Sequence, residues 1–156
     1  MSLFSELFQT AFQGILSPRL HDEKFLGILP EGEVPASFSS LLVLQESAKL
    51  IRSLFFKEQE DSYFFLPCLP PEIHSGRLIN IVTLSGDEIH MEWSKKTLKK
   101  VIVRSRADKK VTFQLQRALK SFRVRSSKNE LGKKMSADEP FSLKANQTVY
   151  LDRFEK

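Results

Sequence analysis

The spacing of apolar residues changes near residue 61, and this change constrains the fold more than any other feature of the chain. Before that point, apolar residues recur every three or four positions, which is typical of amphipathic helices. Two helices are therefore predicted, over residues 2–16 and 39–56. Their apolar faces consist of Phe4, Leu7, Phe8, Phe12 and Ile15 in the first and Leu41, Leu44, Ala48, Ile51 and Phe55 in the second.

After residue 61, apolar and polar residues alternate, which is typical of strands with one buried face. Ile89, Met91 and Trp93 share one such face, so we predict that all three belong to the core. Polar turns separate the alternating segments 63–66, 77–84, 88–93, 98–105, 110–116, 120–127, 140–143 and 148–154. The pattern predicts an α+β fold, with two N-terminal helices packed on a C-terminal antiparallel β-sandwich of about seven to eight short strands.

The change in periodicity predicts two parts of the chain. Residues 1–60 form a helical segment with a turn-rich connection, and residues 61–156 form a β-sandwich domain. The composition includes 13 Phe among 156 residues. We expect most of them in the core, and the alternation points Phe113 and Phe122 inward. No run of about 18 apolar residues occurs, so no transmembrane segment is predicted.

The chain has one cysteine, Cys68, which excludes an internal disulfide. A chain without disulfides fits a reducing compartment, and we expect a cytoplasmic location. Leu66, Pro67, Leu69 and Pro70 surround Cys68 in the sequence. This apolar setting predicts a small, buried and unreactive side chain.

The charge is unevenly distributed along the chain. Residues 1–93 contain 6 Lys and Arg against 13 Asp and Glu, whereas residues 94–135 contain 15 Lys and Arg against 2 Asp and Glu. A basic stripe of this kind either faces solvent or holds phosphate, sulfate or nucleic acid. The candidate residues for polyanion binding are Lys95, Lys96, Lys99, Lys100, Arg117, Lys120, Arg123 and Arg125.

Other candidate chemistry is sparse. Glu88, His90 and Glu92 alternate on one strand face and offer possible metal ligands, but no cluster of His or Cys supports them, and a solvated face is the favoured interpretation. His21 and His74 stand alone near Pro or Gly. No Gly-rich phosphate loop or hydrolase motif occurs. We therefore expect no metal, no cofactor and no catalytic residue in this chain.

Residues 65–105 carry an ordered set of motifs. They comprise a Leu-Pro-rich signature, a Gly before a strand, a strand ending in Trp, a Lys-Thr-Leu turn and a strand ending in Ser. In order, these are Phe65-Leu66-Pro67-Cys68-Leu69-Pro70, then Gly76-Arg77-Leu78, then Ile89, Met91, Glu92 and Trp93, then Lys96-Thr97-Leu98, and then Val101, Ile102 and Ser105. The set resembles the C-terminal region of glycoside hydrolase family 95, the α-L-fucosidase-type enzymes. The resemblance covers residues 40–115 best.

The resemblance implies the last helices of an (α/α)₆ barrel followed by a C-terminal β-domain. In such inverting enzymes a Glu acts as acid, and an Asp with Asn neighbours handles the water. The Asp belongs to an Asp-Gly-Asn motif, which would align near Ala36-Ser37-Phe38-Ser39-Ser40, where none of these residues occurs. The resemblance therefore carries over the fold and not the activity.

We expect a non-catalytic accessory or remnant domain of a glycoside hydrolase, acting as a structural or binding module. Two alternatives stay open: a basic polyanion-binding or nucleic-acid-binding protein that uses residues 95–134, and a subunit of a split glycosidase. Carbohydrate or polyanion is the expected ligand class. Another polypeptide docked on the helical segment is a possible partner, although a monomer is favoured, because residues 17–36 are long enough to let the first helix fold back.

Overall fold

The computed structural model describes residues 40–127 and 129–156, with side chains from Gln45 onward. The predicted helix over residues 2–16 and its apolar face lie outside this range. The second predicted helix is present as α2, Ser40–Phe55, and ends one residue before the predicted boundary. Its last residues belong to a compact unit, Ser53–Lys156, which is described here by itself.

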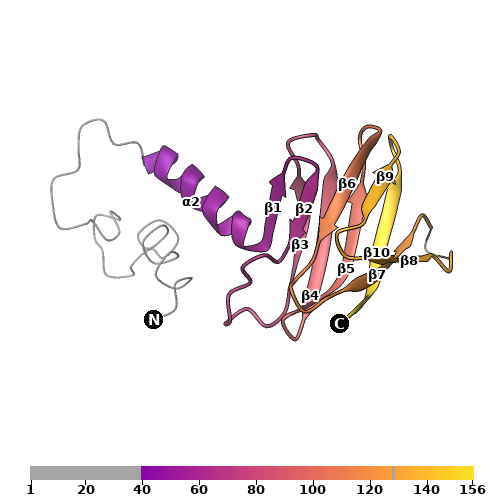
Figure 1. The fold of residues 1–156 in the computed structure, drawn as a ribbon. Helices are drawn as coiled ribbons and strands as arrows, with labels where there is room; N and C mark the ends of the chain where they lie inside the picture. Colours follow the sequence, from indigo (N-terminus) through magenta and orange to yellow (C-terminus); the bar gives the residue numbers. More distant parts are fainter. Residues whose placement is uncertain (1–39, 128) are drawn as a thin grey trace. The chain divides into compact units, whose positions relative to one another are not determined.

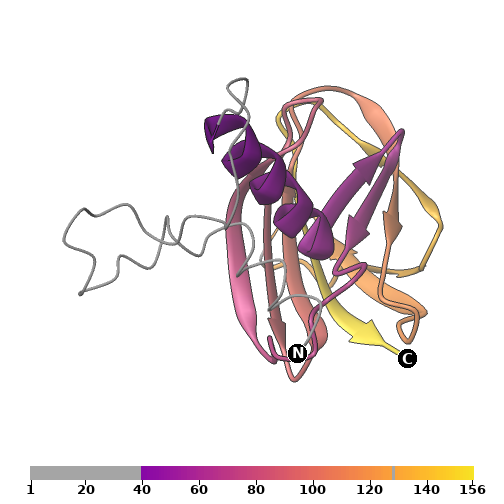
Figure 2. The same cartoon turned by 90° about the vertical axis from the view of Figure 1, so that its left-hand side faces the viewer.

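Two β-sheets form the layers of this unit, as Figures 1 and 2 show. The first sheet has four strands in the order β1-β2-β6-β9. These strands are β1 (Phe56–Gln59), β2 (Ser62–Phe65), β6 (Lys109–Gln114) and β9 (Pro140–Leu143). The β2–β6 pair is parallel, with Tyr63 opposite Phe113, so the sandwich is not wholly antiparallel. The other pairs of this sheet are antiparallel.

The second sheet has six antiparallel strands in the order β3-β4-β5-β10-β7-β8. These strands are β3 (Gly76–Val82), β4 (Glu88–Ser94), β5 (Thr97–Arg104), β7 (Ser121–Arg125), β8 (Lys133–Ser136) and β10 (Thr148–Glu155). The last strand in the sequence, β10, therefore lies between β5 and β7. The strands β3 and β8 form the two edges of the sheet.

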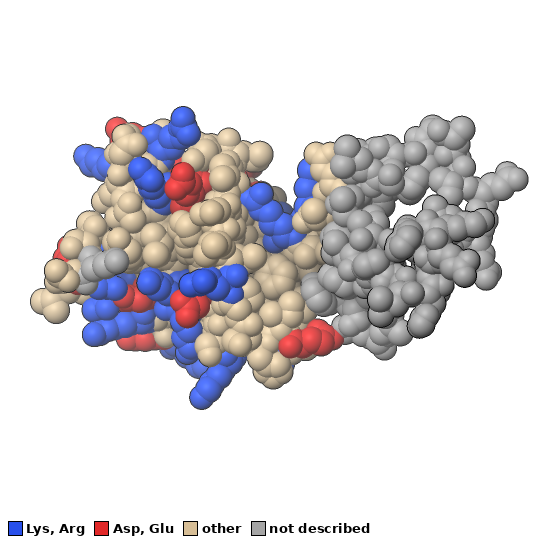
Figure 3. Space-filling model, turned by 180° about the vertical axis from the view of Figure 1, so that it is seen from behind, with Lys and Arg blue, Asp and Glu red and all other residues tan. Residues whose placement is uncertain are grey.

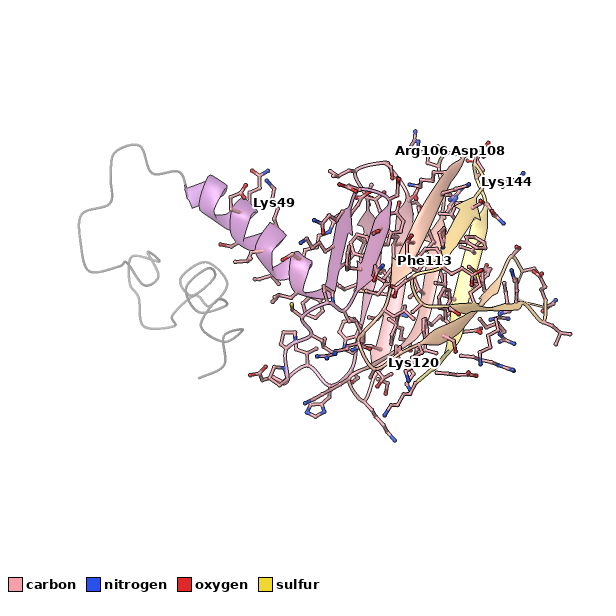
Figure 4. All side chains as sticks on the ribbon, in the orientation of Figure 1. Lys49, Arg106, Asp108, Phe113, Lys120 and Lys144 are labelled. Carbon is pink, nitrogen blue, oxygen red and sulfur yellow. The ribbon has the colours of Figure 1, made fainter. Side chains whose placement is uncertain are left out.

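The core between the sheets is built largely from Phe, as the composition predicted. Phe113 projects from β6 into the space between the layers, as Figure 4 shows. The centroid of its ring lies 6.1 Å from the ring centroid of Phe65, in the same sheet, and 6.0 Å from that of Phe122, in the other sheet. Alternation explains this arrangement, because the inward residues of both sheets interdigitate in a sandwich. The predicted inward positions of Phe113 and Phe122 are confirmed.

The predicted core cluster of β4 is also confirmed. Ile89, Met91 and Trp93 are all buried. The Trp93 indole N–H donates to the Ile73 carbonyl at 3.3 Å. The centroids of the Trp93 and Phe55 rings lie 5.5 Å apart. This hydrogen bond satisfies the one polar group of the indole, which allows the large side chain to be buried.

Two other sequence predictions are corrected by the structure. The described residues form ten strands, not seven to eight, and one helix, and the other predicted helix lies outside them. The two strands that were not predicted are β1, which lies where the helical segment was expected to continue, and β8. Cys68 is exposed, not buried. Its backbone N–H donates to the Leu54 carbonyl at 3.1 Å. None of the described helices is long and apolar enough to cross a membrane.

Candidate functional site

The predicted polyanion-binding residues separate into three groups in the structure. Lys95 and Lys96 form the turn between β4 and β5, and Arg117 and Lys120 lie in the connection between β6 and β7. Lys99 and Lys100 are exposed on β5, where Lys99 is the extra residue of a bulge opposite Glu92 and Trp93. Arg123 and Arg125 lie on β7.

The two segments that contain Lys95, Lys96, Arg117 and Lys120 are linked by the side chain of Gln116 at one end of the sandwich. Its side chain accepts a hydrogen bond from the Leu98 backbone N–H at 3.0 Å and donates one to the Lys96 carbonyl at 2.8 Å. The β4–β5 turn is thereby tied to the β6–β7 connection. We call Lys95, Lys96, Arg117 and Lys120 the basic end; Lys120 is labelled at the lower end of the unit in Figure 4. The Lys120 N–H also donates to the Glu155 carbonyl.

The turn of the basic end has a strained backbone. Lys95 and Lys96 have φ values of 52° and 60°, in the left-handed region that favours glycine. Two consecutive residues of this kind form the tight turn that suits the twist of a β-hairpin. Neither lysine takes part in an ion pair within 4.0 Å in the described part of the chain. The turn therefore presents two charged side chains to solvent.

Arg123 and Arg125 differ from the other predicted cations because they already have a carboxylate partner. The Arg123 Nε donates to one oxygen of Asp152 at 2.7 Å, and Arg125 bonds to the other oxygen. Burial raises the pKa of Asp152, but hydrogen bonds and charge from the two arginines outweigh it and hold the pKa below its usual value. These arginines stabilise the β7–β10 pair, and the structure does not bring them into the basic end.

Figure 3 shows blue Lys and Arg side chains along the lower edge of the β unit, with red Asp and Glu side chains among them. Such mixing reflects ion pairs like those of Asp152, and also the exposed pair Lys134–Glu155. The hydrogen bond from Lys134 is the main cause that lowers the pKa of Glu155. Within the basic stretch, the cations within 4.0 Å of a carboxylate are Arg104, Lys109, Arg123, Arg125 and Lys134, and none of them belongs to the basic end.

The polar face of β4 contains the residues weighed as possible metal ligands. Glu88 lies 3.8 Å from Arg104, and His90 accepts a hydrogen bond at Nδ1 from the Asn80 backbone N–H at 3.4 Å. Across the described residues, no three His, Cys, Asp or Glu side chains gather as a metal site. His90 and Glu92 instead line a groove of about 250 Å³ on the outer face of β3, β4 and β5. His21 lies outside the described residues, and His74 is exposed.

The sequence analysis missed a polar network centred on Asp87, whose side chain is fully buried. Lys109 Nζ lies 2.5 Å from an Asp87 carboxylate oxygen, and the Tyr63 hydroxyl donates to the same oxygen at 2.7 Å. The other oxygen accepts the Arg106 backbone N–H at 2.9 Å. Ser85 joins the network by accepting from Lys109 at 2.5 Å. Ser85 and Asp87 belong to a Ser-Gly-Asp segment, which predicts a turn. Nothing in this pattern predicts that the Asp87 side chain is buried.

This network ties the two sheets together. Tyr63 and Lys109 come from β2 and β6 of the four-stranded sheet, whereas Asp87 precedes β4 of the six-stranded sheet. Burial is the main cause that raises the pKa of Tyr63. Burial lowers the pKa of Lys109, but hydrogen bonds to Asp87 and Tyr63 outweigh it, and the net pKa is raised. The arrangement keeps Lys109 charged and Tyr63 protonated at neutral pH, which suits a structural clasp.

Residues 58–151 match the family model described as glycoside hydrolase family 95, C-terminal domain. The chain belongs to this family, as its motifs predicted, and the matched residues lie within the β unit. A search of curated proteins finds no match to the chain.

Proposed function

We propose that the chain acts as a non-catalytic accessory domain of the family 95 type, with a structural or ligand-binding role. The observation that carries this proposal is the family match, because residues 58–151 match the model of the C-terminal domain of the family. In the enzymes that the chain resembles, the catalytic Glu and Asp belong to the preceding barrel. The buried Asp87 and the partly buried Asp152 are each engaged by cations of the sandwich itself.

The test is hydrolysis of a nitrophenyl α-L-fucoside by the purified chain. Inverting hydrolysis needs two carboxyl groups about 6.5–9.5 Å apart that flank the bond and a water. We expect no turnover above a boiled control. Turnover that disappears when one carboxylate is replaced would overturn the proposal, whereas turnover that survives every such change would indicate a contaminating enzyme.

A second candidate function, polyanion binding, is supported by the basic end. Gln116 ties the turn of Lys95 and Lys96 to the connection that contains Arg117 and Lys120, and none of these four side chains forms an ion pair within 4.0 Å in the described residues. The left-handed backbone of Lys95 and Lys96 is an additional hint, because strained conformations cluster at functional sites.

Heparin binding as a function of salt concentration tests this candidate. Each phosphate or sulfate contact that is lost should reduce the slope of log affinity against log salt by about 1. We expect that loss for Lys96→Ala and for Lys120→Ala. Lys144→Ala is the matched control, since Lys144 lies at the opposite end of the unit in Figure 4. An equal change in the control would show nonspecific attraction to a basic protein.

A further inference from the structure

The groove on the outer face of β3, β4 and β5 has the features of a small ligand site. Its volume is about 250 Å³, and its lining includes Arg77, Ile79, His90, Glu92, Lys100 and Ile102. Pockets for drug-sized molecules measure roughly 300–1,000 Å³, so this groove suits a single ring and not a larger ligand. All of the lining residues belong to one sheet of the β unit.

Apolar side chains lie on two sides of the groove. Ile79, on the edge strand β3, is 55% exposed, although a residue of this type is usually buried. Ile102 is half-buried on β5 and lies opposite His90 in the strand register. Together they offer an apolar surface on which one face of a ring can rest.

A β-bulge fixes the orientation of His90 between these two residues. The β3–β4 register shifts between Leu78 and Ile81, and Asn80 has a φ of 57°. This geometry aims the Asn80 N–H at His90 Nδ1. Because Nδ1 accepts this hydrogen bond, Nε2 is the nitrogen that carries the hydrogen of the neutral ring and remains a donor. Bulges of this kind often lie beside functional sites and re-aim a side chain.

Three charged side chains surround the same groove. Glu92 stands opposite Arg77 on one neighbouring strand and opposite Lys100 on the other. No two of them come within 4.0 Å as an ion pair, whereas Glu88 and Arg104, further along the same strands, do. The groove thus has two cations and one carboxylate available to a ligand, and a formal excess of one positive charge.

We propose that this groove binds one hexuronic acid unit of an acidic polysaccharide. The apolar face of the sugar ring lies on Ile79 and Ile102, and its hydroxyls bond to Glu92 and to His90 Nε2–H. The sugar carboxylate binds Lys100, which matches the excess positive charge. This inference rests on the proposed role as an accessory domain of a glycoside hydrolase, and it names the ligand class for the binding role.

The test is a titration of the isotope-labelled full chain with digalacturonic acid, followed by two-dimensional NMR. We expect the backbone amides of Ile79, His90 and Ile102 to shift together. The neutral disaccharide galactobiose should bind about tenfold more weakly, because it lacks the group that forms a charge-assisted hydrogen bond.

Two adjacent lysines provide a matched pair of variants. Lys100 and Lys99 are both exposed, but only Lys100 lines the groove. Lys100→Met should weaken binding of digalacturonic acid about tenfold, and Lys99→Met should leave it unchanged. Both are surface changes, and an otherwise unaltered spectrum shows that each variant is folded.

Three results would overturn the inference. Absence of shifts up to the solubility limit of the sugar would remove the site. Equal binding of galactobiose would remove the acidic ligand class. Shifts at Lys96 and Lys120 instead of the groove, or equal weakening by both lysine variants, would assign the binding to general positive charge. The fucoside assay remains a separate readout, because sugar binding in the groove does not enter it.

Discussion

Asp87 illustrates what a single residue can do in this sandwich. Its carboxylate is fully buried and receives a cation and a phenol from the opposite sheet. Sequence reasoning did not single it out, because acidic residues in Ser-Gly-Asp turns normally face solvent. The prediction for Cys68 was wrong in the opposite direction, because apolar neighbours in the sequence do not determine whether a side chain is buried.

Removing the Asp87 carboxylate should strongly destabilise the fold. Asp87→Ala removes the carboxylate that accepts from the Tyr63 hydroxyl and balances the Lys109 charge, and removing one partner of such a buried ion pair costs about 3–5 kcal/mol. Urea denaturation measures this loss. Glu88→Ala is the neighbouring control, since its exposed pair with Arg104 should contribute only about 0–1 kcal/mol. Similar losses for both variants would contradict the role assigned to Asp87.

The same clasp predicts a loss of stability at alkaline pH. The folded chain holds the protons of Tyr63 and Lys109 more tightly than the unfolded chain, where the pKa values are 10.0 and 10.5. Their contribution is therefore complete below pH 10.0 and is lost as the pH rises through the higher folded values. Thermal unfolding between neutral and alkaline pH should show this loss. The double variant Tyr63→Phe, Lys109→Met should show a flatter profile, and an unchanged profile would contradict the assignment.

At the level of elements, the sequence predicted those strands in which apolar residues alternate. Residues 88–93 are the clearest example, with three inward residues in six positions. The strand β8 was not predicted because Met135 is its only apolar residue, so no alternation is visible. The strand β1 was not predicted because Phe55 and Phe56 continue the apolar pattern of the helix, although the helix ends at Phe55 and the strand begins at Phe56. Parallel pairing of β2 with β6 is a long-range property that no local pattern encodes.

The positions of the candidate site residues followed only partly from the sequence. The family resemblance placed a turn at Lys96-Thr97-Leu98, and in the structure the turn between β4 and β5 consists of Lys95 and Lys96. It did not foresee that Asp152, far along the chain, neutralises Arg123 and Arg125. It also treated the outer residues of β4 as a solvated face, because a groove depends on the neighbouring strands β3 and β5.

The pairing of β3 with β4 depends on a glycine. Gly76 lies opposite Trp93, and a Cβ atom at position 76 would come within 2.4 Å of Trp93 Cζ2. We expect Gly76→Ala to cost about 1–3 kcal/mol in chemical denaturation, because the indole must move in a packed core. In a Trp93→Phe background the added cost of Gly76→Ala should be smaller, since the smaller ring leaves space. Equal costs in both backgrounds would show that the indole is not the obstacle.

At the scale of the whole molecule, the two possible starts of the β domain, residue 53 and residue 61, predict different stabilities for the isolated domain. The unit Ser53–Lys156 contains all ten described strands, including β1, whereas the sequence-based boundary at residue 61 removes β1. Loss of β1 also removes the buried Phe56 ring, which packs on Tyr63 and Phe65.

We expect a chain of residues 53–156 to unfold cooperatively, with Trp93 fluorescence as the probe. A chain of residues 61–156 should be less stable by several kcal/mol, because burying one Phe alone contributes about 1.5–3 kcal/mol and the edge of β2 is left unpaired. If the two chains are equally stable, β1 is dispensable and the boundary at 61 is adequate.

The position of β10 has a consequence for biosynthesis. Its residues pair with β5 on one side and β7 on the other, yet they leave the ribosome after every other strand of the six-stranded sheet. Until then, the inner edges of β5 and β7 have no partner, and unpaired edges invite association with other chains. The six-stranded sheet can therefore close only after translation has reached the end of β10, and nascent or prematurely terminated chains are the forms that need protection by chaperones.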